Sequence, residues 1–151
     1  MNNAPYKKAS DLAEYLTAQL ATVLISNGYL TDIGTTVYRG KRNIDDDLPP
    51  CSVLIEGEDR PADSGPTQTI IDIDYAAVAY LKCDPDNPND AANKAIKDLK
   101  KLFFGDTKNF GGRAKWIVYK GRDIGPRADG KSLVMAVVHF SVRYAETLAD
   151  A

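Results

Sequence analysis

The chain has few of the residues from which catalytic and metal sites are usually built: its 151 residues include one histidine, two cysteines and one tryptophan. His139 lies in an apolar segment, which is typical of a packed, hydrogen-bonded side chain, whereas a general base needs an orienting partner and a cleft. The spacing around Gly111 and Gly112 matches neither the Walker phosphate loop nor the dinucleotide-binding loop. The segment from Asp84 lacks the Gly and Glu of a calcium-binding loop. We therefore expect no catalytic residue, no cofactor and no bound metal.

The sequence also lacks an excess of charge and any hydrophobic run that could span a bilayer. Its net charge is −2, whereas a nucleic-acid-wrapping protein usually has a strongly basic surface, so a DNA-binding module is disfavoured. The polar start MNNAPYKKAS has no signal-peptide core, which predicts folding in a reducing cytoplasm. Cys51 and Cys83 are then small, buried thiols, with a disulfide or a reactive thiol as the alternative.

What the chain does have is the composition of one folded domain, 44% apolar and 26% charged. Apolar residues at helical spacing predict amphipathic helices at residues 11–27 and 89–104, after a loose arm at 1–9. Residues 60–66 predict a turn-rich connector. Segments rich in β-branched and aromatic residues predict strands at 35–40, 51–56, 68–82, 115–120 and 133–144. Without regular βαβ alternation, this order predicts an α+β fold with a mainly antiparallel mixed sheet and two amphipathic helices packed on one side.

Two of the predicted strands are apolar on both faces. In 68–82, alternate residues from Ile71 to Leu81 form one apolar face, and the opposite face begins acidic and ends apolar. The strand 133–144 has a similar pattern. Because helices cover one face only, we expect a neighbouring subunit to cover part of the other, with these candidate interface residues: Val78, Tyr80, Leu133 and Met135.

Charged residues mark further candidate surfaces. The loop 41–50 includes three adjacent carboxylates that resist burial together, Asp45, Asp46 and Asp47. A solvated loop, a metal site and a functional surface are all possible interpretations. Basic residues near turns and strand ends suit pairing with carboxylates of a neighbouring subunit, and suit a monomer equally well: Arg39, Lys41, Arg42, Arg122 and Arg127. The outer face of helix 89–104 is lysine-rich, which is typical of a solvated face and also of contact with an acidic partner.

The order of short motifs along the chain resembles the tail terminator (tail completion) proteins of long-tailed bacteriophages. These motifs are GYLTDIG at 28–34, VYRG at 37–40, EGED at 56–59, YLKCDPDNPND at 80–90 and VYKGRDIG at 118–125, so the resemblance spans nearly the whole chain. It implies a single tail-terminator-like domain, residues 1–151, that forms a homo-oligomeric ring, commonly a hexamer. Such a ring caps the tail tube, ends tube polymerisation and provides the surface for head–tail joining.

The resemblance also implies partners and a location. The partners are the phage tail tube protein and the head–tail connector protein, without contact to a membrane. DNA passes through the ring without specific binding, and Asp45, Asp46 and Asp47 face the channel or the assembly surface. The protein is then part of the virion, at the tail–head junction, after assembly in the host cytoplasm. The alternatives are a head-completion or connector protein, and a small ligand-binding or enzymatic α+β domain.

Overall fold

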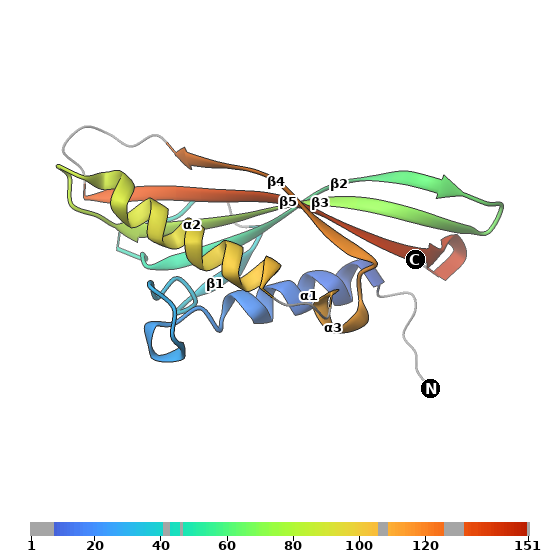
Figure 1. Cartoon of the computed structure of the whole chain (residues 1–151), viewed down its shortest axis with the longest axis horizontal. Helices are drawn as coiled ribbons and strands as arrows, with labels where there is room; N and C mark the ends of the chain where they lie inside the picture. The colour runs from blue at the N-terminus through green and yellow to red at the C-terminus, as the bar shows by residue number, and fades with distance from the viewer. Residues whose placement is uncertain (1–7, 41–42, 46, 106–108, 126–131, 151) are drawn as a thin grey trace.

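The computed structural model describes residues 8–40, 43–45, 47–105, 109–125 and 132–150. A five-stranded sheet has the order β1-β2-β3-β5-β4, with β1 parallel to β2 and the other pairs antiparallel. The helices lie on one face of this sheet (Figure 1). The predicted α+β fold is thus confirmed. The elements in chain order are α1 (Lys8–Leu20), η2 (Ile25–Asn27), β1 (Val37–Arg39), β2 (Cys51–Ser64), β3 (Gln68–Lys82), α2 (Pro88–Phe104), α3 (Asn109–Gly112), β4 (Trp116–Gly125), β5 (Leu133–Thr147) and η3 (Leu148–Asp150).

The core lies between the helices and the face of the sheet that they cover. On β3, every second residue from Ile71 to Leu81 is buried, as the period-two pattern predicts. Phe103 of α2 stacks on Phe140 of β5, with ring centroids 4.5 Å apart. Leu16 of α1 and Leu99 of α2 are completely buried in the same cluster.

The first helix lies closer to the N-terminus than predicted: it begins at Lys8, inside the expected arm, and it ends at Leu20 rather than at residue 27. Residues 1–7 of that arm lie outside the described residues. After the helix the chain folds back, and the Gly34 N–H donates to the Val23 carbonyl at 2.8 Å. A Cβ at Gly34 would lie 2.6 Å from the Leu20 carbonyl oxygen, so this close approach requires glycine.

The second strand is longer than predicted. Residues 60–64, predicted as part of a turn-rich connector, continue β2 to Ser64 and pair with β3. Two register shifts, between Glu56 and Asp59 and between Pro61 and Asp63, accommodate the irregular sequence. Pro61 is tolerated because no described strand pairs with the outer edge of β2 at this point. The resulting hairpin runs past the helices at the right of Figure 1.

Candidate assembly surfaces

The sheet face opposite the helices, here called the open face, is apolar at one end. Val53, Val78 and Val137 are buried there, with 0%, 4% and 8% exposure. Partly buried side chains surround them: Tyr38, Ile44, Ile55, Ala76, Tyr80 and Met135. Three predicted interface residues, Val78, Tyr80 and Met135, therefore lie together. Leu133 is half-buried at the start of β5 and lies outside this cluster.

The loop between β1 and β2 contacts this apolar cluster. Ile44 packs against it, so the chain itself covers part of the open face. Asp45 and Asp47 are exposed, as predicted for clustered carboxylates, while Asp46 lies outside the described residues. The loop thus combines an apolar contact to the sheet with acidic side chains in solvent.

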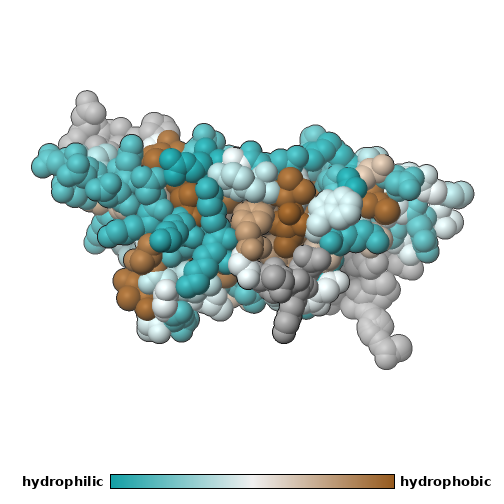
Figure 2. All heavy atoms as spheres, viewed as in Figure 1, coloured by the Kyte–Doolittle hydropathy of each residue, from teal (hydrophilic) through white to brown (hydrophobic). Residues whose placement is uncertain are grey.

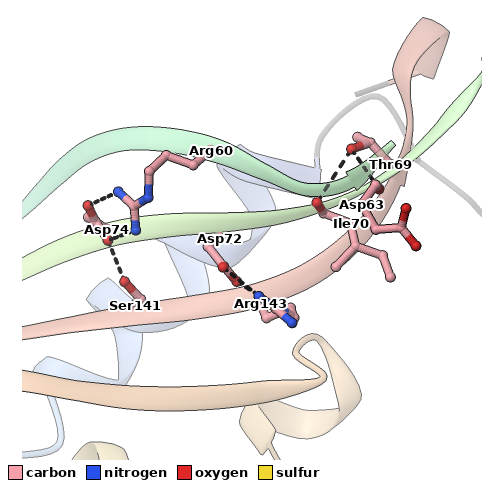
Figure 3. A network of polar contacts seen from close by, with 8 residues as sticks. All are labelled: Arg60, Asp63, Thr69, Ile70, Asp72, Asp74, Ser141 and Arg143. Atoms are coloured by element: carbon pink, nitrogen blue, oxygen red, sulfur yellow. Dashed lines mark hydrogen bonds and ion pairs between the residues drawn. The ribbon is translucent and has the colours of Figure 1, made fainter. Parts of the chain in front are cut away.

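The other end of the open face is charged (Figure 3). Arg60 of β2 forms a bidentate ion pair with Asp74 of β3, with one N–O distance of 2.9 Å, and the Ser141 hydroxyl donates to the same carboxylate. These contacts, led by the Arg60 hydrogen bonds, lower the pKa of Asp74 to about 2.

A second ion pair lies beside the first. Arg143 donates two 2.7 Å hydrogen bonds to Asp72, which hold the pKa of the Asp72 carboxyl below its ordinary value. The Arg143 guanidinium also lies 4.5 Å from the centroid of the Trp116 ring. Arg143 thus joins β3, β5 and the edge strand β4 on the open face.

His139 is hydrogen-bonded, as its sequence context predicts, but its side chain is exposed rather than packed in the interior. Its Nε2 lies 3.1 Å from Asp123 Oδ2 on β4, and both side chains are exposed to solvent, 44% and 72% respectively. His139 also lines a hollow of about 350 Å³, together with Arg60 and Lys120. The nearby Ser141 hydroxyl is bonded to Asp74, so it does not complete a nucleophile–histidine pair. Within the described ranges, no three metal-ligating side chains converge.

The predicted basic residues differ in their surroundings. Arg39 pairs with Glu56 on β2 at 2.6 Å, and Arg122 donates to the Asn93 side chain on α2 at 2.7 Å. Both are therefore held by contacts within the chain. Three others lie outside the described residues: Lys41, Arg42 and Arg127.

Two oppositely charged surfaces lie far apart in the molecule. The first, here called the lysine face, consists of the exposed side chains of Lys94, Lys97, Lys100 and Lys101 on α2, where hydrophilic residues line the helix in Figure 2. The second, here called the acidic arm, is residues 56–64 of β2, all exposed and rich in carboxylates. Sequence reasoning missed the arm because Gly57, Pro61 and Gly65 indicate turns rather than a strand.

Asp98 is a further residue that the sequence analysis did not single out. It is 2% exposed within α2, and its carboxylate accepts the backbone N–H groups of Leu30 and Thr31 at 2.9 and 2.8 Å, and the Thr31 hydroxyl at 2.6 Å. It thereby fixes the loop after η2 against the helix. Its place on the buried stripe, beside Ala95, Leu99 and Leu102, is the signal that marks it.

A second hollow, of about 550 Å³, opens between this loop, the end of β3 and the start of α2. Cys83 lies at its edge and is half-buried, Cys51 is fully buried, and no disulfide joins the two. No described helix is long and apolar enough to cross a membrane. No model of a known protein family matches the chain, and comparison with curated proteins finds no significant match.

Proposed function

We propose that the protein is a tail terminator of a long-tailed bacteriophage, a structural protein that forms a homo-oligomeric ring, commonly a hexamer. The observation that carries the proposal is the pair of oppositely charged surfaces, the acidic arm and the lysine face, on one elongated subunit. This arrangement suits a ring, because each subunit of a ring presents two different, complementary surfaces to its two neighbours. The order of the sequence motifs supports the same assignment.

The proposed ring acts by capping an open assembly. It docks on the last ring of tail tube protein and offers no site for another tube ring, so tube polymerisation ends. Its other side meets the head–tail connector protein, which places the protein in the virion at the tail–head junction. DNA passes through the ring without specific binding, and the carboxylates of Asp45, Asp46 and Asp47 keep it from adhering by repelling its phosphates.

This function needs no chemical step, cofactor or metal. The His139–Asp123 pair is the feature that favours an enzyme instead, because a carboxylate can orient an imidazole for proton transfer. We propose that the pair only links β5 to β4. His139→Ala then leaves tube capping unchanged. A stoichiometric metal, nucleotide or flavin in the natively purified protein would instead favour the enzymatic or ligand-binding alternative.

Deletion of the gene from its phage tests the proposal. We expect tails of uncontrolled length that fail to join heads, measured by electron microscopy of lysates, and restoration by the gene supplied in trans. The head-completion alternative predicts a different result: tails of normal length beside unjoined heads. Tails of normal length that are fully joined would contradict both assignments.

A further inference from the structure

The acidic arm has a free outer edge. β1, the neighbour of β2 on that side, pairs only with Ser52, Val53 and Leu54. No described strand pairs with the outer edge of residues 55–64, although their inner edge pairs with β3. In Figure 1 this part of the hairpin extends beyond the helices. The arm is therefore accessible to a partner.

The arm is poorly suited to bind a partner by adding a strand. Its two register shifts interrupt the regular spacing of backbone groups, and Pro61 has no backbone N–H to donate. Bulges, proline and charges are the features by which natural sheets block edge-to-edge pairing. A partner of this edge is therefore bound through side chains, and those side chains are mainly carboxylates.

Several of these carboxylates have no counter-charge of their own. Within the described residues, Glu56 is paired with Arg39, but no ion pair includes Glu58, Asp59 or Asp63. Arg60, the cation on the arm itself, is bonded to Asp74 across the sheet. The arm thus carries an uncompensated negative charge.

The lysine face has the opposite imbalance. No ion pair among the described residues includes Lys94, Lys97, Lys100 or Lys101. Lys94, Lys97 and Lys101 follow one another at three- and four-residue spacing, so they form a single stripe on α2. α2 packs on β5, β3 and β4, and in Figure 1 it lies toward the end of the molecule opposite the tip of the hairpin.

We propose that the acidic arm of one copy docks on the lysine face of the next copy, and that this is the contact that repeats around the ring. One chain carries both halves of the contact but cannot join them, because they lie toward opposite ends of its long axis. A second copy satisfies both charges without any further partner. This inference rests on the proposed ring and names the surfaces that build it.

Charge-reversal variants test the contact. The arm variant is Asp59→Lys with Asp63→Lys, the helix variant is Lys94→Glu with Lys97→Glu, and the double-reversed chain combines all four substitutions. The matched control reverses two exposed charges elsewhere, Glu14→Lys and Lys82→Glu. The measurement is the protein concentration that caps half of the open tail tubes purified from the gene-deletion phage, with circular dichroism to confirm folding.

We expect the arm variant and the helix variant each to require on the order of tenfold more protein or more, since like charges then face each other across the contact. The double-reversed chain restores the wild-type value, because opposite charges face each other again, and the control matches the wild type. Raising the salt concentration weakens wild-type capping, as expected for an exposed charge contact.

The outcomes separate the two proposals. If the arm variant and the helix variant are both folded and cap like the wild type, the proposed contact is wrong and the terminator function stands. The same conclusion follows if the double-reversed chain remains defective. If the wild-type protein itself fails to cap tubes at any concentration, the proposed function is wrong and the contact loses its basis with it.

Discussion

The two faces of β3 differ in what they contact. On the covered face, every second residue from Ile71 to Leu81 is buried under the helices. On the open face, Asp72 and Asp74 are held by arginines at one end, and Val78 and Tyr80 belong to an apolar cluster at the other. The covered face therefore carries most of the fold's stability, and the open face is freer to serve contacts with other molecules.

Truncation on the covered face has the largest expected effect. Leu16→Ala and Leu99→Ala should each lower the free energy of unfolding by roughly 2–5 kcal/mol, because both side chains are completely buried and leave a cavity. Denaturant unfolding measures the loss. Lys97→Ala, at an exposed position of α2, is the control and should change stability by less than about 0.5 kcal/mol. If both leucine variants lost less than about 0.5 kcal/mol, the covered face would not be the main source of the fold's stability.

Asp98→Asn is expected to have the next largest effect. The Asp98 carboxylate accepts bonds from two backbone N–H groups and a hydroxyl, and an amide offers one oxygen in place of two. Hydrogen bonds to a charged group contribute about 1.5–3 kcal/mol, and a loss in this range should appear in the same unfolding experiment. Thr31→Ser keeps the hydroxyl and should be much milder. An equal loss in both variants would mean that packing, rather than the carboxylate, fixes the loop.

On the open face, Asp74→Asn should have a small and pH-dependent effect, under about 1 kcal/mol because the Arg60–Asp74 pair is partly exposed. The pKa of Asp74 falls from its ordinary value of 3.8 to about 2 in the folded protein. The carboxylate therefore stabilises the fold above pH 4, and this contribution is lost as the pH falls toward 2. Unfolding free energies of both proteins should converge over that interval. A constant difference down to pH 2 would show that charge does not stabilise this end of the face.

The smallest effect on stability is expected in the loop beside the open face. Replacing Asp45, Asp46 and Asp47 with Asn should leave the thermal midpoint nearly unchanged, because the described members, Asp45 and Asp47, are exposed. If the loop lines the channel or an assembly surface, the same variant should alter tail assembly or DNA passage, measured as infectious particles per lysate. A normal yield of infectious particles would contradict a role in the channel or in assembly, and these carboxylates would then serve only to keep the loop in solvent.

The sequence predicts the covered face well because its pattern is local. Alternation along 68–82 and helical spacing in 89–104 are visible within each segment, and both elements are found with nearly those bounds. The early end of α1 was harder to predict, because the chain after it packs against Gly34, which is distant in sequence from the helix end.

The open face is harder to predict because its contacts join distant residues. Nothing near His139 indicates Asp123, and nothing near Asp72 indicates Arg143, until the strand order is known. The arm was missed for a related reason: Pro61 normally argues against a strand and is tolerated at this free edge. The clusters of charged residues are visible in the sequence. Which of these residues form ion pairs depends on the fold and cannot be read from the sequence.

The pairing of β3 with β5 also sets the order of events during synthesis. Its register joins Lys82 to Leu133 and Gln68 to Thr147, so the central ladder of the sheet links segments separated by most of the second half of the chain. At typical elongation rates of about 5–20 residues per second, β3 waits on the order of three to ten seconds for its partner to be made. During that interval its apolar residues lack one neighbouring strand. The nascent chain is therefore most exposed to misassociation just before β5 emerges, and α2, which forms from local contacts, is available to shield β3 first.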